Sequence, residues 1–377
     1  YPEVPPATVA QDLERVSQLL HRLWQPGPDC PWCELGLPQP APFSVRAQAP
    51  YKADVALHYL CNNHCAHCYN EPGRRQASLS LEDWKRTLNR LWDIGVPYVI
   101  FTGGEPTLHP HLTELVAHAS ALGQITGLNS NGRLLAEPEL PATLLQAGLD
   151  HVQITLHSDL PEVHDNLVSA PAWEETVAGI RACLELGLHT LTNTTLLAAN
   201  AGRAVEMVEF LHTLGLRTFA MNGIIRSGCG AYYPGGLRES QVLPLLERVQ
   251  ERAAELDMKF LWYTPTRYCR LSPVELGLGP KACNAAEYSI CVEPNGSVLP
   301  CQSYYEPVGN LLTDLWENIW NSPLFLRIRN RREHPREADL PRRCVECEEL
   351  EICGGGCMLE LHKEETKPYA VGDRQAQ

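Results

Sequence analysis

The chain has 377 residues, 44% of them hydrophobic and 20% charged, which is ordinary for a globular protein with room for one large domain and a smaller one. Its 45 acidic residues outnumber the 31 basic ones and give a formal charge of −14. That charge repels phosphate backbones and anionic lipid, so we expect neither nucleic acid nor a membrane as a partner. We find no apolar run of about 18 residues and no secretory signal, and we therefore expect a cytoplasmic protein.

Cysteine is the unusual part of the composition, with 15 residues. A short secreted chain with this content would be interpreted as a disulfide framework. In a longer chain without a signal, the same content favours metal or redox chemistry in a reducing compartment.

Residues 1–50 form a lead-in segment. Apolar residues recur at helical spacing between residues 9 and 23, and a proline-rich stretch then carries Cys30 and Cys33. This pair is open to three interpretations: a redox pair, half of a zinc site, or the source of a ligand for a cluster elsewhere.

Residues 51–260 alternate between short apolar segments and amphipathic ones. The predicted strands are 54–60, 98–103, 125–131, 151–157, 189–197 and 218–224. The predicted helices lie near 80–93, 110–122, 138–148, 172–187, 201–214 and 237–257. Six strand–helix units in series predict a parallel sheet with right-handed crossovers, curled into a full or partial barrel. The pattern ends near residues 258–268, so we expect a separate cysteine-rich domain over 261–377.

The first motif is CNNHCAHC, directly after the first predicted strand. Cys61, Cys65 and Cys68 are spaced so that three thiolates converge from a tight loop, as an iron–sulfur cubane requires. Three ligands leave one iron open for a substrate or cofactor, as in catalytic metal sites. The alternatives are zinc, or a fourth cysteine that completes an electron-transfer cluster.

The second motif is FTGGEP, at the end of the second predicted strand. Gly103 and Gly104 permit a close approach of the backbone, and Glu105 can pair with an ammonium group. An ordinary strand-to-helix turn is the alternative.

Later strand ends place polar groups at the same rim, where barrels of this kind bind ligands. These are Ser130, Thr155 and Asn193. Each is equally well explained as a satisfied buried polar residue.

The third block lies near the C-terminal end. Its second half has the spacing C-x2-C-x5-C-x3-C, formed by Cys344, Cys347, Cys353 and Cys357. Its first half has Cys283, Gly296 and Cys301 in the spacing C-x12-G-x4-C. Zinc ribbons also use paired C-x2-C motifs and are the alternative here.

Together these motifs resemble the radical S-adenosylmethionine (SAM) superfamily, and the third block resembles the SPASM auxiliary-cluster domain, over roughly residues 53–362. The resemblance implies an α/β fold, a partial (β/α)6 TIM-like barrel with a C-terminal SPASM domain. It implies a [4Fe–4S] cluster on the first three cysteines, which binds SAM through the open iron. When reduced, that cluster cleaves SAM to a 5′-deoxyadenosyl radical that abstracts hydrogen from the substrate.

The resemblance also assigns residues to SAM. His67 would lie against the adenine, and the Gly103–Glu105 motif would bind the amino group. Ser130, Thr155 and Asn193 would contact the ribose and carboxylate.

One or two auxiliary clusters are implied. The first would use Cys283, Cys301 and Cys357, with Cys269 as the fourth ligand and Cys291 as its rival. The second would use Cys344, Cys347 and Cys353. The family's last cysteine is absent, so this cluster takes His362, a carboxylate or a distant residue as its fourth ligand, or does not assemble. Cys183 and Cys229 are interpreted as free cysteines.

The leading hypothesis from this resemblance is modification of a ribosomally made peptide by crosslinking, epimerisation or oxidation. Sulfatase-maturing relatives place an Asp base where this chain has Gln302, which disfavours that subclass. We expect an electron donor such as flavodoxin or ferredoxin. Residues 1–50 are too few for a full recognition domain, which implies either a separate peptide-recognition protein or none.

Two alternatives remain. One is a small-molecule radical SAM enzyme, such as a tetrapyrrole side-chain enzyme of the heme d1 pathway or a quinone-cofactor maturase. The other is a non-catalytic iron–sulfur carrier or zinc scaffold, which would not bind SAM.

Overall fold

The computed structural model describes residues 5–23, 47–71, 74 and 76–361. The chain divides into two compact units, residues 1–48 and 49–377. In the first unit, helix α1 (Pro6–Leu23) confirms the predicted helical periodicity, and its Val9, Leu13 and Val16 side chains are exposed. Cys30 and Cys33 lie outside the described residues.

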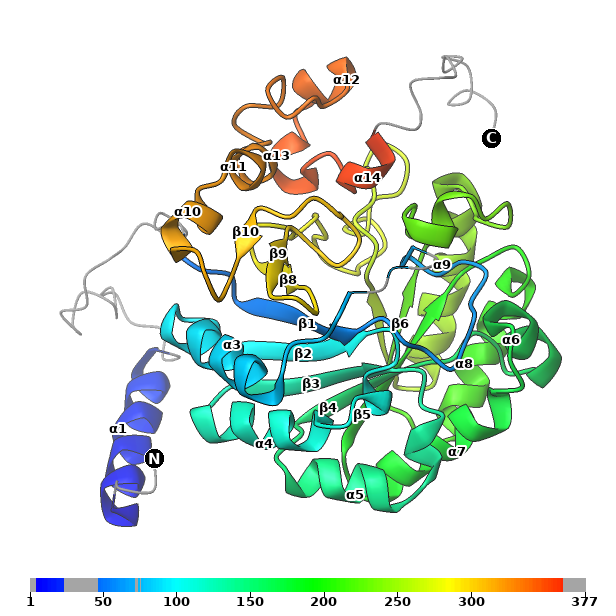
Figure 1. Cartoon of the computed structure of the whole chain (residues 1–377). Helices are drawn as coiled ribbons and strands as arrows, with labels where there is room; N and C mark the ends of the chain where they lie inside the picture. Colours follow the sequence, from blue (N-terminus) through cyan, green and yellow to red (C-terminus); the bar gives the residue numbers. More distant parts are fainter. Residues whose placement is uncertain (1–4, 24–46, 72–73, 75, 362–377) are drawn as a thin grey trace. The chain divides into compact units, whose positions relative to one another are not determined.

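The second unit is built on a ten-stranded sheet in the order β10-β9-β8-β1-β2-β3-β4-β5-β6-β7 (Figure 1). Its parallel part runs in chain order. The strands are β1 (Lys52–His58), β2 (Tyr98–Gly103), β3 (Ile125–Ser130), β4 (His151–Thr155), β5 (His189–Thr195), β6 (Thr218–Asn222) and β7 (Lys259–Trp262). The sheet curls but remains open, with β7 at one edge and β10 at the other.

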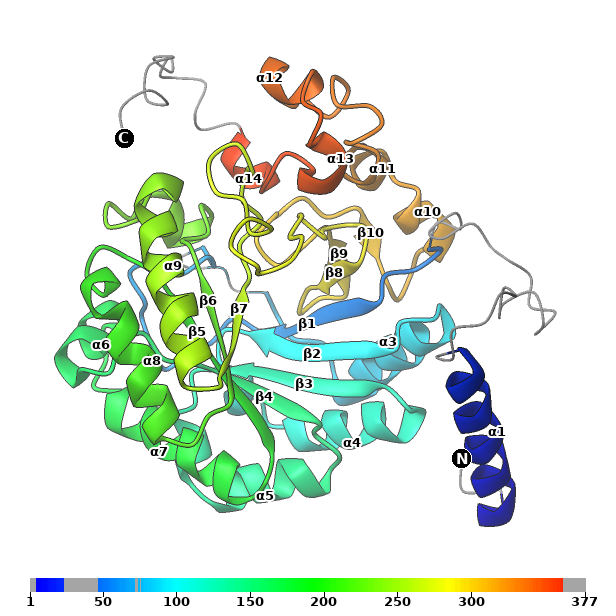
Figure 2. The same cartoon turned by 180° about the vertical axis from the view of Figure 1, so that it is seen from behind.

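Helices lie along the outer side of the curled sheet, as both views show (Figures 1 and 2). They are α3 (Leu81–Asp93), α4 (Leu112–Leu122), α5 (Glu139–Gln146), α6 (Pro161–Val168), α7 (Trp173–Glu185), α8 (Ala204–Thr213) and α9 (Glu239–Glu255). Short 3-10 turns precede or follow some of them: η1 (Pro106–Leu108), η2 (Leu134–Ala136), η3 (Ala201–Arg203) and η4 (Gly228–Ala231).

The two faces of the sheet differ in character. On the outer face, alternate residues such as Val55, Phe101 and Ile154 are buried and pack with Trp84 and Leu88 of α3 and with the other helices in the main core. On the inner face, the intervening residues are mostly polar. In β4, for example, Gln153 and Thr155 remain partly exposed, whereas their neighbours Val152 and Ile154 are buried. The interior of the curled sheet is therefore a polar surface that water still reaches.

The cysteine-rich segment extends this same sheet. Strand β8 (Ser289–Val292) pairs in parallel with β1, from Lys52↔Ser289 to Val55↔Val292. Strands β9 (Ser297–Leu299) and β10 (Gly309–Asn310) follow in antiparallel order. Five short helices gather beyond them: α10 (Trp316–Trp320), α11 (Pro323–Arg329), α12 (Arg342–Val345), α13 (Leu350–Cys353) and α14 (Met358–Leu361). The division at residue 260 stays a prediction.

The expected fold class is confirmed. All six predicted strand–helix units are present, and the strand at 98–103 has the predicted bounds. Helix α6 and strand β7 were not predicted. Both are short, with 8 residues in α6 and 4 in β7, so each offers little apolar pattern from which to predict it. Among the described residues, no helix combines the length and the apolar character needed to cross a membrane.

Candidate active site and cluster sites

The loop that carries Cys61, Cys65 and Cys68 starts three residues beyond the end of β1. Its backbone is fixed from two sides. The amides of His64 and Ala66 donate to the carbonyls of Val168 and Leu167, and the Gly230 amide donates to the Cys68 carbonyl at 2.9 Å. The tight spacing of the motif and these anchors hold the three cysteines on one compact loop at the carboxyl end of the sheet.

The three thiols of this loop act on one another. Burial raises the pKa of Cys65, and the thiols of Cys68 and Cys61 raise it further. Burial likewise raises the pKa of Cys68 to about 11. The Asn63 amide donates to the Cys61 sulfur at 3.4 Å. Buried thiols at close quarters resist ionisation, so the loop favours a cation that binds thiolates.

The glycines of the second motif serve close packing of the backbone. A Cβ on Gly103 would lie 2.2 Å from the His58 carbonyl oxygen, and one on Gly104 would lie 2.1 Å from the Leu60 carbonyl oxygen. Gly103 also has a φ of +126°. The amides of Gly104 and Glu105 then donate to these two carbonyls at 2.7 and 2.8 Å. The end of β2 is thereby pressed against the start of the cysteine loop.

This contact brings Glu105 next to the cysteine loop. Its carboxylate is buried, and burial raises its pKa, while four hydrogen bonds oppose that shift. Oε1 accepts from the Thr107 amide, the Thr107 hydroxyl and the Ser130 hydroxyl, whereas within the described part of the chain Oε2 accepts from the Asn131 amide alone, at 2.7 Å. Oε2 therefore retains lone-pair capacity for a further donor.

His67 lies inside a histidine cluster. Its Nε2 lies 3.2 Å from Nε2 of His157, and its ring packs edge-on against that ring and against Tyr233. Burial lowers the pKa of His67 to about 4. The imidazole is therefore neutral at physiological pH, and its contact with an adenine stays a prediction.

Two of the three predicted strand-end residues share the inner face. Thr155 and Asn193 are paired across β4 and β5, and the buried Oδ1 atom of Asn193 has no hydrogen-bond partner among the described residues. Ser130 instead pairs with Ile154, so it belongs to the outer face. It is satisfied there, since its hydroxyl donates to Glu105 at 2.8 Å and accepts from the Gly132 amide at 2.9 Å.

The cysteine loop is also tied to the cysteine-rich segment. The Tyr69 hydroxyl, one residue beyond Cys68, donates to Oε1 of Gln302 at 3.1 Å. Gln302 itself follows Cys301. Arg74 forms an ion pair with Glu293 and lies over the Tyr305 ring at 4.1 Å. The first motif and the first half of the third block thus meet directly.

The cysteines of the third block separate into two groups. Cys283, Cys301 and Cys357 form the first, because the thiols of Cys283 and Cys301 both raise the pKa of Cys357, after burial. Cys291, the rival ligand, is fully buried in β8 beside Ala56 and Leu299. Its thiol lies close enough to Cys301 for the two to interact.

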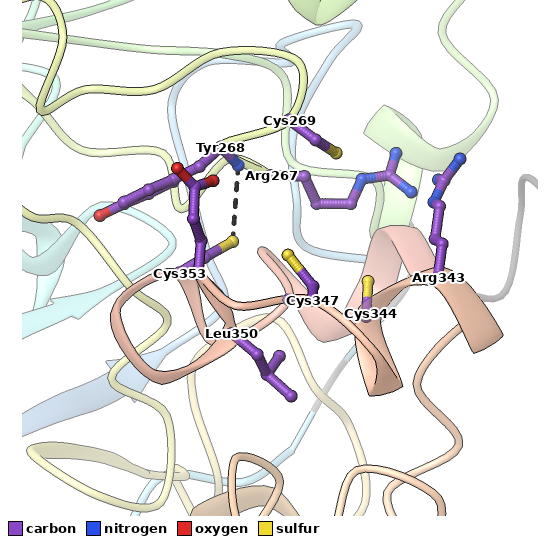
Figure 3. A pocket seen from close by; sticks show the side chains of 10 residues that line it. Arg267, Tyr268, Cys269, Arg343, Cys344, Cys347, Leu350 and Cys353 are labelled. Carbon is purple, nitrogen blue, oxygen red and sulfur yellow. Dashed lines mark hydrogen bonds between the residues drawn. The ribbon is translucent and has the colours of Figure 1, made fainter.

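The second group lines a cavity of about 90 Å³ (Figure 3). Its cysteines are Cys344, Cys347, Cys353 and also Cys269. The sequence analysis placed Cys269 with the first group, as its fourth ligand, whereas in the structure it lies with the second.

One buried arginine holds the two halves of the third block together. Arg331 has no exposed surface, and its guanidinium donates to the carbonyls of Cys283, Gly354 and Ile328. Gly354 opens the GGG turn, whose three residues all have φ between +63° and +81°. The turn places Cys357 back toward Cys283.

Among the described residues, no three His, Cys, Asp or Glu side chains are placed to hold a single metal ion. A tetrahedral zinc site would bring its sulfurs within ~4 Å of one another. A cubane differs, since each thiolate binds a different iron and the sulfurs stay further apart.

Several residues of the site were missed by the sequence analysis. Asn129, Gln153 and Asn222 add to the polar inner face, and strict alternation in β3 and β4 was the signal that could have revealed them. Cys229 was interpreted as a free cysteine and forms no disulfide in the described structure, and its thiol lies near enough to those of Cys65 and Cys68 to raise their pKa. No sequence signal indicated that proximity.

Comparison with known proteins agrees with this geometry. The family model of the radical SAM superfamily matches residues 55–211, and that of the SPASM iron–sulfur cluster-binding domain matches residues 283–348. The chain is 30% identical to the PqqA peptide cyclase of Gluconobacter oxydans over 343 residues, which is 86% of this chain and 87% of that protein. It is 26% identical to the subtilosin biosynthesis protein AlbA of Bacillus subtilis, over 82% of this chain and 68% of that protein.

Solved structures with the same fold include Streptococcus suis SuiB. Bound to S-adenosylmethionine, it matches with a TM-score of 0.69 and 19% identity, over 84% of this chain and 75% of that one. SuiB bound to its precursor peptide SuiA matches with a TM-score of 0.71 and 17% identity, over 95% of this chain and 86% of that one. The chain therefore belongs to the radical SAM superfamily, as an enzyme that uses iron–sulfur clusters and S-adenosylmethionine and carries a SPASM domain at its C-terminal end.

Proposed function

We propose that this enzyme modifies a ribosomally made peptide, by abstracting a hydrogen atom from one of its residues to form a crosslink, an epimer or an oxidised side chain. The observation that carries the proposal is the cysteine loop at the carboxyl end of β1, beside a polar inner face that is still partly exposed. The substrate class is supported by the near full-length similarity to a PqqA peptide cyclase.

The SAM-binding cluster is assigned to Cys61, Cys65 and Cys68. The donor set fits, because three thiols share one loop and no fourth cysteine of that motif competes for the last iron. When bound and reduced, the cluster and SAM supply a nucleoside-based hydrogen abstraction.

The chain's own residues would orient SAM. Glu105 Oε2, with one hydrogen bond, is available to the amino group. The unpartnered Asn193 Oδ1 and the adjacent Thr155 are available to its hydroxyl groups. Ser130 would act through Glu105, which it holds in place. His67, Gly103 and Gly104 complete the predicted set.

The cysteines of the third block would hold auxiliary clusters, which would supply an acceptor for an electron released from the substrate. A crosslink made from two X–H bonds releases one hydrogen atom to the nucleoside and a second as a proton plus an electron, and that electron needs an acceptor. We assign Cys283, Cys301 and Cys357 to one such cluster, and Cys344, Cys347 and Cys353 to the other.

A flavodoxin or ferredoxin would reduce the SAM-binding cluster or reoxidise the auxiliary ones. Exposure of Cys269 and Cys347 supports an approach from the surface. A separate peptide-recognition protein is proposed alongside.

The test is to incubate the anaerobically reconstituted enzyme, SAM and a reductant with each short peptide encoded beside its gene. We expect 5′-deoxyadenosine to form, together with a peptide that has lost a pair of hydrogens or, for epimerisation, gained solvent deuterium. The Cys61→Ala variant serves as the control and should produce neither.

Formation of 5′-deoxyadenosine without any change in a neighbouring peptide would keep the enzyme class and overturn the peptide substrate. A tetrapyrrole or other small molecule processed under the same conditions would do so directly.

A further inference from the structure

We propose that Cys269 completes the second auxiliary site, so that this cluster is bound by four thiolates from Cys269, Cys344, Cys347 and Cys353. The proposal rests on the iron–sulfur chemistry of the SPASM domain and does not depend on the peptide substrate. Cys269 supplies the fourth sulfur beside Cys344, Cys347 and Cys353.

The four cysteines of the proposed site converge in space. The four sulfurs face one cavity, three of them from the segment 344–353 and the fourth from the loop after β7 (Figure 3). The cavity, at about 90 Å³, far exceeds the roughly 10–15 Å³ that a single water needs by the same measure. A multi-atom group, and not one bridging water, suits this space.

The loop that carries Cys269 is held beside this cavity by hydrogen bonds. The Tyr268 amide donates to the Cys353 sulfur at 3.4 Å, so the residue before Cys269 is bonded directly to another member of the group. Amides of Arg270 and Leu271 close a turn on the Arg267 carbonyl at 2.8 and 3.0 Å. Amide-to-sulfur hydrogen bonds of this kind stabilise cluster thiolates and tune their potential.

Positive side chains beside the cavity balance the charge that a thiolate-bound cluster would carry. Four thiolates on one cluster carry a net negative charge that must be balanced in a partly buried site. Arg267 and Arg343 both line the cavity.

Cys269 could belong to the first or to the second auxiliary site, and its position distinguishes the two. Cys269 lines the same cavity as Cys344 and Cys353, whereas none of Cys283, Cys301 and Cys357 is among the described residues that line it. Glu349 also lines the cavity and is the carboxylate that competes for the role of fourth ligand.

The test starts from a parent with Cys61, Cys65 and Cys68 all changed to Ala, so that only auxiliary clusters contribute iron. After anaerobic purification, iron, sulfide and the EPR signals of the reduced protein are measured. Two four-iron clusters give about eight irons per chain. We expect Cys269→Ala to lose the same iron and the same EPR signal as Cys344→Ala, and the double variant to lose no more than either alone.

Combining Cys269→Ala with Cys357→Ala should instead remove both clusters, because the two residues then serve different ones. Cys183→Ala, at a buried cysteine of α7 outside both groups, is the matched control and should retain the parent's iron. The assignment would be overturned if Cys269→Ala retained all of the parent's iron, or if Glu349→Gln lost the iron of one cluster. It would also be overturned if the iron losses of Cys269→Ala and Cys344→Ala were additive in the double variant.

Cys269→Ser covers the case in which the alanine variant does not fold. Serine oxygen can still bind iron, so the cluster should persist with an altered EPR line shape and potential. The altered signal should be the one that Cys344→Ala abolishes. If it is the one that Cys357→Ala abolishes, Cys269 belongs to the first site.

Discussion

The strand–helix region (52–262) and the cysteine-rich region (263–361) are stabilised in different ways. The first has helices of 8 to 17 residues around a large apolar core. The second has helices of 4 to 7 residues, and its part up to Ile328 packs into the same main core. Among the described residues, those from Ala338 to Met358 form a separate apolar cluster of five members. So small a cluster contributes little stabilisation to this last segment, which leaves buried hydrogen bonds and bound metal to supply the rest there. The strand–helix region therefore holds its cysteines on a scaffold that is stable without metal, whereas part of the cysteine-rich region depends on its metal-bound cysteines for order.

Removal of iron should separate the two regions most strongly. We expect a chelator to abolish the order of α12–α14 while β1–β7 stay folded, because metal binding is part of the folding free energy only in the second region. Hydrogen exchange followed by mass spectrometry measures this directly: segment 340–361 should exchange freely and segment 98–103 should stay protected. Equal loss of protection in both segments would show that the two regions depend on metal to the same extent.

Arg331→Met tests the hydrogen-bonded part of that difference. Three carbonyls would lose a buried charged donor, so the free energy of unfolding should fall by about 3 kcal/mol or more. Urea titration of the cluster-loaded protein measures the change. Arg327→Met removes a partly exposed ion pair with Asp339 and should cost under about 1 kcal/mol. Equal costs for the two variants would mean that Arg331 does not hold this region together.

Glu105→Gln tests a site residue of the strand–helix region. The amide oxygen can still accept from Thr107 and Ser130, so the fold should persist. Loss of the charge opposite an ammonium should weaken SAM binding by about 10- to 100-fold. Equilibrium dialysis with labelled SAM provides the measurement. Glu114→Gln, at an exposed position on α4 paired with His111, is the control. Unchanged affinity in Glu105→Gln would reject its assignment to the amino group.

Tyr69→Phe probes the junction between the regions and should have the smallest effect. It removes the hydroxyl that donates to Gln302 and keeps the ring. A double-mutant cycle with Gln302→Leu should give a coupling energy of about 0.5–1.5 kcal/mol. Additivity within about 0.3 kcal/mol would show that the two regions are not joined through this pair.

Much of the first region could be predicted from the sequence because each of its elements is long and periodic. Strand 98–103 and the helix predicted near 80–93 were located from apolar and amphipathic spacing, and the observed helix Leu81–Asp93 is capped by the Ser80 side chain. The cysteine loop and Glu105 were found because each belongs to a short motif at the end of a predicted strand.

The rest depends on contacts that local patterns do not encode. Pairing of β8 with β1 joins residues more than 200 positions apart, and no periodicity in either strand reports it. Cys269 was assigned by its place before Cys283 in the chain, but the turn at 267–271 directs it to Cys353 instead. Ser130 was grouped with Thr155 by strand position, although alternation puts the two on opposite faces.

The parallel pairing of β8 with β1 also limits how this enzyme can be engineered. A replacement C-terminal module from another family member would have to supply a strand that extends the same edge in the same register. A slip of one residue would exchange the faces on which Cys291 and Val292 lie. Chimeras cut inside the loop before residue 289 should therefore fail unless the transplanted piece keeps this strand, however well its clusters assemble by themselves.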